Sequence, residues 1–200
     1  MNQPLNQNVR SFNNYDYYHG KLPVDDLKKI KELCQVSNSG ERANSHLAGF
    51  IENEYVLKKE CRDLVLPHIY KGACSMLDNP SMRWRNLSSW INYQKKYEVN
   101  PLHNHTGMLS YVMWINIPYD LDDELNLDHI KNSTLRQDAT AFTFVYMDVH
   151  GTLRQQPFQL TKEDEGDFII FPAQVHHMVM PFYTSDGYRI SIAGNIAPRN

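Results

Sequence analysis

Hydrophobic and polar positions follow two different periods along this chain. Near its start, apolar residues recur at three-residue spacing between Pro23 and a polar stretch at 37–40: Val24, Leu27, Ile30 and Leu33. This spacing predicts one amphipathic helix that packs by its apolar stripe. A second helical stretch is expected from about Glu54 to Leu77, and Pro67 indicates a kink or a split within it.

From about residue 82 the pattern changes to short aromatic and β-branched runs separated by Gly, Pro, Asn and Asp. Such runs are typical of strands joined by turns. The expected strands are 83–93, 108–117, 139–149, 158–160, 167–171, 175–180 and 188–196. Several short strands of this kind indicate a sandwich or jelly roll with the helices packed outside it. The acidic stretch 120–138 is expected to be a long connection, such as a substrate loop or lid.

Composition adds a division of the chain into three parts of one expected domain. Residues 1–20 form a polar N-terminal arm, residues 21–80 a helical lead-in packed on the barrel, and residues 81–200 the β core. A chain of 200 residues with 42% hydrophobic positions is long enough for one sizeable core but short for two. The arm contains no apolar run long enough for a signal peptide or a membrane span, so we expect a cytoplasmic protein.

Charge and cysteine usage exclude two classes of site. The net charge of -3 and the pI near 6.3 argue against a surface that neutralises many phosphates, and therefore against a nucleic-acid partner. Cys34, Cys61 and Cys74 are odd in number and widely spaced. They are expected to be reduced, mostly buried thiols rather than a thiolate metal site.

Candidate chemistry begins with two histidine clusters. His103 and His105 lie two residues apart, and alternate side chains of an extended backbone share a face, so both imidazoles can converge on one ion. His176 and His177 follow the apolar run 168–171, and two neighbours on a strand cannot both face inward. The clusters together offer three nitrogen ligands. Iron(II), zinc and copper all accept imidazole, so histidine alone does not choose the metal.

A basic residue follows these histidines on the next expected strand. Arg189 shares one face of that strand with three further residues: Ser191, Ala193 and Asn195. A guanidinium fork beside a hydroxyl group suits a carboxylate, because two parallel charge-assisted hydrogen bonds fix its orientation. The sequence therefore predicts a carboxylate site next to a metal site.

An ordered set of motifs between residues 22 and 197 resembles the 2-oxoglutarate- and iron(II)-dependent oxygenases. The resemblance is greatest to the prolyl-hydroxylase-like branch found in phages and marine bacteria. Besides the helical lead-in 43–51, the set comprises Trp90-Ile-Asn92, His103-x-His105, Leu109-Ser110, Gly166-Asp-Phe-Ile-Ile-Phe-Pro172, His177-x-Val-x-Pro181 and Arg189-Ile-Ser191.

The resemblance implies a fold and a metal site. The fold would be mainly β with flanking helices, a double-stranded β-helix of the cupin-like jelly-roll kind. Iron would be held by His103, His105 and His177. His177 is chosen over His176 because it fits the H-x-V-x-P pattern of the family.

The resemblance also implies a cosubstrate site and an activity. Arg189 and Ser191 would bind the far carboxylate of 2-oxoglutarate, and Tyr93 would contact the same molecule. The activity would be that of a dioxygenase, a hydroxylase that uses O2 and couples decarboxylation of 2-oxoglutarate to C–H oxidation, with ascorbate as the reductant in assays. The substrate would be a protein side chain, such as proline, or a small molecule, and a phage-encoded enzyme would act in the host cytoplasm. The sequence gives no oligomeric state.

The chain departs from the family pattern at two positions. His105 stands where the wider superfamily prefers Asp or Glu, so three neutral ligands would leave the metal more positive. His105 could instead turn away, or the site could favour another metal. Trp114 stands where relatives often carry a tyrosine, and we expect it in the core.

Two alternative functions therefore stay open. One is a cupin-type dioxygenase with three histidines and no 2-oxoglutarate. The other is a non-catalytic jelly-roll binding module whose contact surface would include exposed aromatic side chains at Tyr15, Tyr17 and Tyr18.

Overall fold

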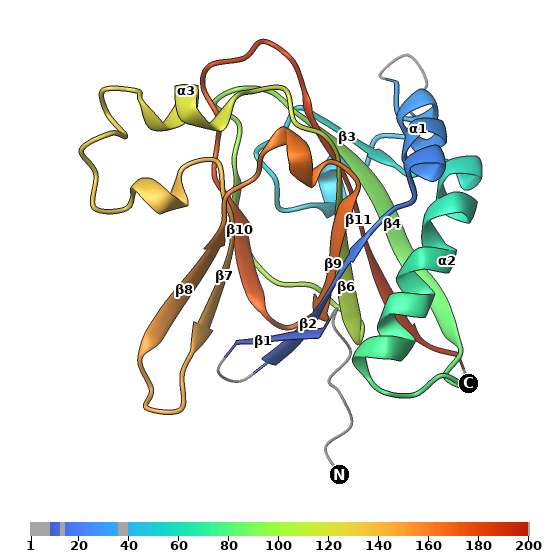
Figure 1. The fold of residues 1–200 in the computed structure, drawn as a ribbon. Coiled ribbons are helices and arrows are strands. Elements are labelled where there is room, and N and C mark those ends of the chain that lie inside the picture. Colours follow the sequence, from blue (N-terminus) through green and yellow to red (C-terminus); the bar gives the residue numbers. More distant parts are fainter. Residues whose placement is uncertain (1–8, 13–14, 36–39, 200) are drawn as a thin grey trace.

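Two antiparallel sheets face each other, and two helices cover the outer face of the larger sheet (Figure 1). The computed structural model describes residues 9–12, 15–35 and 40–199. The helices are α1 (Val24–Leu33) and α2 (Lys59–Met76). The expected class, a mainly β jelly roll with flanking helices, is confirmed.

The strands form sheets of unequal size. The larger sheet has the order β1-β2-β9-β6-β11-β4-β3 and the smaller sheet the order β5-β10-β7-β8. The strands of the larger sheet are β1 (Val9–Phe12), β2 (Tyr15–Lys21), β3 (Asn53–Val56), β4 (Trp84–Gln94), β6 (Leu109–Asn116), β9 (Asp167–Pro172) and β11 (Arg189–Pro198). Those of the smaller sheet are β5 (Asn100–His103), β7 (Phe142–Met147), β8 (Leu153–Phe158) and β10 (His176–Val179).

Both faces of the larger sheet are buried, each against a different layer. Alternate side chains of a strand point to opposite faces, so Ile91 and Tyr93 of β4 join the core between this sheet and the helices. Trp90 of β4 and Ala193 of β11 instead join the core between the two sheets. Arg189 and Ser191 lie on the same face of β11, so polar groups also occur within this second core.

Several expected boundaries are wrong in detail. Helix α2 begins at Lys59 rather than Glu54, because Glu54 belongs to β3, and Pro67 lies inside α2 without splitting it. The strand expected at 158–160 is β8 at Leu153–Phe158, a polar strand at the edge of its sheet. Edge strands lack a second partner and carry no strong apolar alternation, so the pattern misplaced it.

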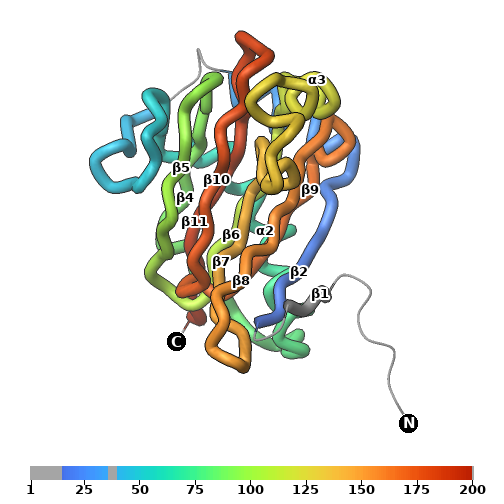
Figure 2. Tube along the Cα trace, turned by 90° about the vertical axis from the view of Figure 1, so that its left-hand side faces the viewer, coloured from blue at the N-terminus to red at the C-terminus, as the bar shows by residue number. Residues whose placement is uncertain are grey.

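The expected polar arm is part of the larger sheet over much of its length. Strand β2 pairs with β9 from Tyr18↔Ile170 to Lys21↔Asp167, as can be followed in Figure 2. Tyr17 and Tyr18 are buried, so they cannot form the exposed contact surface expected for a binding module. Residues 1–8 and 13–14 of that arm lie outside the described residues.

The stretch 120–138 has secondary structure of its own. It contains α3 (Leu121–Leu125) and a 3-10 turn at Arg136–Asp138. The fully buried Glu124 carboxylate accepts hydrogen bonds from the backbone N–H groups of Tyr183 and Thr184 and from the Thr184 hydroxyl. These bonds fix the stretch to the segment that precedes β11. The expected long connection is therefore locally folded and hydrogen-bonded to the rest of the protein.

The three cysteines are free, as expected. Cys34 and Cys61 are buried with their Sγ atoms 3.8 Å apart, and Cys74 is half-buried. In the described part of the chain, each helix is too short or too polar to cross a bilayer.

Gly194 lies where β11 passes closest to its neighbours. A Cβ atom there would lie 2.5 Å from the Ser88 carbonyl oxygen and 2.6 Å from the Tyr111 hydroxyl oxygen. Because a backbone oxygen cannot swing away, a Gly194→Ala variant is expected to lose about 2 kcal/mol of unfolding free energy. Urea denaturation of the two proteins tests this. Equal stability of wild type and Gly194→Ala would contradict it.

A three-histidine candidate metal centre

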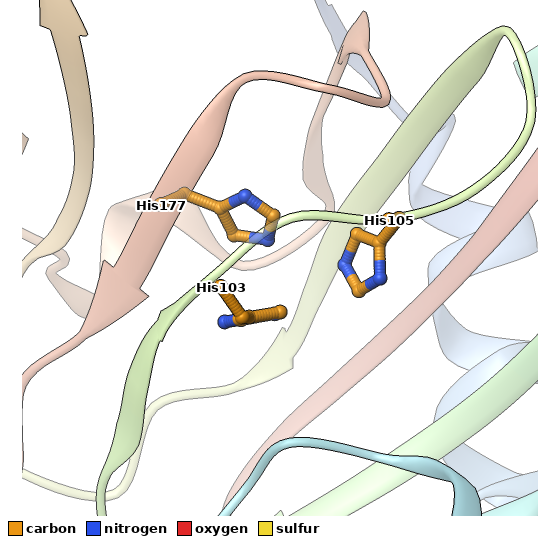
Figure 3. Close-up of side chains that lie close together, drawn as sticks. All are labelled: His103, His105 and His177. Carbon is orange, nitrogen blue, oxygen red and sulfur yellow. The ribbon is translucent and has the colours of Figure 1, made fainter.

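Three histidines from separate segments gather between the two sheets. One ring nitrogen from each of His103, His105 and His177 lies within 4.8 Å of the other two. His103 ends β5, His105 follows in the next turn, and His177 lies on β10 (Figure 3). His103 and His177 are direct partners in the β5–β10 pairing, which brings their rings to 4.2 Å between centroids. The structure thus brings together all three histidines that the sequence singled out.

Backbone carbonyl groups fix the tautomers of two of these rings. The Nδ1 atom of His103 lies 2.7 Å from the Pro101 oxygen, and that of His177 lies 3.0 Å from the Val175 oxygen. A carbonyl oxygen can only accept, so each Nδ1 carries the proton and donates it. Each Nε2 therefore keeps its lone pair, which is the arrangement that metal-binding histidines usually have.

His105 is positioned through its backbone. Its N–H donates to the Ala173 oxygen at 2.9 Å, and its carbonyl accepts from the Gln174 side chain at 3.1 Å. The Trp90 ring lies 5.4 Å from the His105 ring. These contacts join the turn after β5 to the turn before β10. The place of the His105 ring therefore depends on residues 173 and 174 as well as on its own strand.

Burial keeps the cluster uncharged. Burial, followed by repulsion from the neighbouring His103, lowers the pKa of His105 to about 4. Burial also lowers the pKa of His103, and it holds the pKa of His177 well below its ordinary value. The three imidazoles are therefore neutral at pH 7, the form that binds metal ions.

The donor set fits an iron(II) ion. Three neutral imidazole nitrogens suit Fe(II), Zn(II) or Cu(II). No carboxylate belongs to the cluster among the residues that the structure describes. His176 is exposed, whereas His177 is packed against Phe142 and Phe171.

Arg189 is buried on the inner face of β11 and is fully hydrogen-bonded. Its Nε and one terminal nitrogen donate to the Gln94 carboxamide oxygen at 3.0 and 2.8 Å. The remaining N–H groups donate to the carbonyl oxygens of Thr140 and Met180, each at 2.6 Å, and to the Tyr119 hydroxyl at 3.3 Å. All five guanidinium donors have protein acceptors in this arrangement.

A small cavity of 20 Å³ lies between the sheets beside Arg189. It has room for about one water molecule. Its lining includes Ser191, Asn92, Gln94 and Val179. Val179 lies two residues after His177 on β10, so the cavity is about 7 Å along the strand from the histidines.

Tyr93 does not face this cavity. Its ring packs on the helix side of the larger sheet, against Tyr55 and Tyr188. Tyr93 therefore cannot contact a cosubstrate held between the two sheets. Its neighbours on β4, Asn92 and Gln94, face the cavity instead, and the sequence reading missed both.

A second, larger opening of 580 Å³ borders the cluster at His105. Trp90, Asn195 and Arg62 contribute to its lining, which contains no Asp or Glu. The candidate site therefore has two ends: the small cavity beside Arg189 and this wide groove. The stretch 120–138 lines neither of them.

A family model described as "Putative 2OG-Fe(II) oxygenase" matches residues 88–195, more than half of the chain. The chain belongs to this family. Membership implies Fe(II) and 2-oxoglutarate as metal and cosubstrate, and the three-histidine cluster of the oxygenase is consistent with iron binding. No curated protein matches the sequence of the oxygenase.

Solved structures share the fold of the oxygenase at low sequence identity. A prolyl-4-hydroxylase from Pseudomonas putida has a TM-score of 0.59 at 13% identity, over 93% of this chain and 94% of that one. A 2OG-Fe(II) oxygenase-family oxidoreductase from Burkholderia pseudomallei has a TM-score of 0.55 at 13% identity, over 90% and 83%. A non-haem α-ketoglutarate-dependent epimerase from nogalamycin biosynthesis has a TM-score of 0.53 at 12% identity, over 92% and 81%.

Glu54 is a buried carboxyl group of the oxygenase that the sequence reading missed as well. It lies opposite Asn92 in the β3–β4 pairing and is 1% exposed, with an Asn44 amide at 3.3 Å. Burial, followed by repulsion from Glu98, raises the pKa of Glu54 from 4.5 to about 7. Glu54 therefore stabilises the fold fully below about pH 4.5, and this contribution is lost as the pH rises through about 7.

A Glu54→Gln variant is accordingly expected to be more stable than wild type at pH 8, by on the order of 2 kcal/mol, and equally stable at pH 4.5. Thermal unfolding at both pH values tests this. The control is Glu52→Gln, since Glu52 is exposed and pairs with Lys95, so its removal gives no gain. A gain for Glu54→Gln that is the same at both pH values would be contrary to the expected titration.

Proposed function

We propose that this oxygenase is a 2-oxoglutarate- and Fe(II)-dependent dioxygenase that hydroxylates its substrate. The observation that carries the proposal is the convergence of His103, His105 and His177 with two Nε2 lone pairs free. In this proposal the three imidazoles hold Fe(II). Iron(II) with bound 2-oxoglutarate supplies the oxidation of a C–H bond by O2, coupled to conversion of 2-oxoglutarate into succinate and CO2.

The protein supplies placement and exclusion of water. Phe142 of the smaller sheet and Phe171 of the larger sheet pack against His177, so they shield this ring from water. In the proposal Arg189 and Ser191 hold the distal carboxylate of 2-oxoglutarate at the small cavity. In the proposal the carboxylate beside the keto group balances one of the two positive charges of iron, and the distal carboxylate balances the charge of Arg189.

The substrate is proposed to lie in the 580 Å³ groove that borders His105. A protein side chain, and a prolyl residue in particular, is the proposed target. Support comes from fold likeness to the Pseudomonas putida prolyl-4-hydroxylase, which spans 94% of that chain. Free thiols are typical of a reducing compartment, so we place the enzyme in the cytoplasm, and in the host cytoplasm if a phage encodes it.

A second candidate is a three-histidine dioxygenase that works without 2-oxoglutarate. One observation favours it: every N–H donor of Arg189 already has a protein acceptor. A cosubstrate carboxylate therefore has no free donor at this guanidinium unless one acceptor moves.

Anaerobic titration separates the two candidates. If the proposal holds, addition of Fe(II) and 2-oxoglutarate together gives a visible charge-transfer band that neither gives alone. With O2 and ascorbate, succinate then forms, faster in the presence of a proline-containing peptide substrate. Iron binding without the band and without succinate would favour the second candidate.

A further inference from the structure

Arg189 is a buried cation without an anionic partner. It is 2% exposed, and its five N–H groups donate to four neutral acceptors: one carboxamide oxygen that receives two of them, two backbone carbonyl oxygens and one hydroxyl. It takes part in no ion pair within the described ranges. Buried charges are normally paired, because neutral acceptors compensate the lost hydration incompletely. The site is therefore electrostatically incomplete.

Rotation of a single side chain, Gln94, would free two N–H groups on one edge of the guanidinium. The bonds to Thr140 and Met180 end on backbone oxygens, which are fixed by the fold. The Gln94 oxygen, in contrast, receives Nε and a terminal nitrogen together, the edge that a carboxylate uses in bidentate pairing. Gln94 thus occupies the place of a carboxylate.

Gln94 is also held at its other end. Its Nε2 donates to the Glu98 carbonyl oxygen at 2.6 Å, across the turn between β4 and β5. Gln94 and Arg189 are direct cross-strand partners, so the contact forms without bending either strand. The small cavity beside them holds only 20 Å³, far less than a five-carbon diacid needs.

Two unpartnered oxygens line the same cavity. The Oδ1 atoms of Asn92 and Asn100 are buried without a hydrogen-bond partner. Unsatisfied buried polar atoms are rare in folded proteins, and at a cavity they indicate groups that meet a ligand or a water. These two amide oxygens can therefore still accept hydrogen bonds at the place where the cavity would widen if Gln94 moved.

We propose that Gln94 is the gate of the cosubstrate pocket: its carboxamide holds the Arg189 fork in place of a carboxylate and swings out when 2-oxoglutarate binds. This inference rests on the proposed function and names the residue that sets cosubstrate affinity. Rotation breaks two bonds to Arg189 and one to Glu98, and it exposes two parallel N–H groups to the incoming carboxylate. Thr140, Met180 and Tyr119 keep the guanidinium in position meanwhile.

The test compares Gln94→Ala, Gln94→Asn and Gln94→Glu by anaerobic titration with Fe(II) and 2-oxoglutarate, read from the charge-transfer band. Gln94→Ala and Gln94→Asn leave the fork open, so both are expected to bind 2-oxoglutarate about tenfold more tightly than wild type. Gln94→Glu places a carboxylate on the fork and is expected to weaken binding at least about a hundredfold. Gln155→Ala, which removes an exposed glutamine on β8, is the matched control and leaves affinity unchanged.

The outcomes separate this inference from the proposed function. If wild type binds 2-oxoglutarate and Gln94→Ala and Gln94→Asn bind it no more tightly, the gate is refuted while the function stands. If neither wild type nor these variants bind 2-oxoglutarate, both proposals fall. Binding by Gln94→Ala but not by wild type would support the gate strongly. Melting temperatures of all variants show whether each is folded.

Discussion

A His177→Ala variant is expected to bind Fe(II) at least about a hundredfold more weakly than wild type and to lose succinate formation. Each ligand of a multi-histidine site contributes about 3 kcal/mol, so two remaining imidazoles cannot retain the ion. His177 is the most buried of the three rings, so no solvent-exposed side chain can replace it. Equilibrium dialysis against Fe(II) under anaerobic conditions measures the loss.

The neighbouring residue provides the control for this variant. His176→Ala removes an exposed imidazole on the other face of β10, and it is expected to keep iron and activity. The melting temperature of metal-free His177→Ala shows whether the empty space beside Phe142 has disturbed the fold. If His177→Ala bound one equivalent of iron and turned over normally, the proposed three-histidine metal centre would be wrong.

An Arg189→Ala variant is expected to lose both stability and cosubstrate binding. It strands the oxygens of Thr140, Met180 and Gln94 in the core without donors, at about 1–3 kcal/mol for each group. We expect unfolding free energy to fall by about 4 kcal/mol and the melting temperature by about 10 °C. Affinity for 2-oxoglutarate is expected to fall at least about a hundredfold.

Arg189→Lys and Arg85→Ala separate the two effects. A lysine keeps the charge but not the fork, so Arg189→Lys is expected to recover part of the stability and little of the affinity. Arg85 is exposed on β4, and its replacement changes neither quantity. Differential scanning of the metal-free protein gives stability, and the charge-transfer titration gives affinity. Tight 2-oxoglutarate binding by a folded Arg189→Ala protein would assign the carboxylate to other residues.

The histidine cluster could be found from sequence because strand alternation is a local property. His103-x-His105 and the choice between His176 and His177 each depend on which residues share a face. The same rule placed Arg189 and Ser191 on one face of β11, and the structure has both at the small cavity. Only the fold itself shows that these segments meet.

Alternation failed for β4 because both of its faces are buried. Trp90 and Asn92 face the smaller sheet, whereas Ile91 and Tyr93 face the helices, so apolar and polar residues do not mark an inside and an outside. A tyrosine was a reasonable candidate for a cosubstrate contact, yet the face that meets the cavity is set by the neighbouring strands. Gln94 and Glu54 were missed because segments distant in the sequence bury them, and the local pattern does not show this.

The pairing of His103 with His177 would give a metal bound there a second role. Strand β5 is the edge of the smaller sheet, and its pairing with β10 is interrupted after this very position. An ion coordinated by both rings would connect the edge strand β5 to its neighbour β10. Because a ligand that binds only the native state raises its stability, chelation should loosen this edge before the rest of the barrel melts.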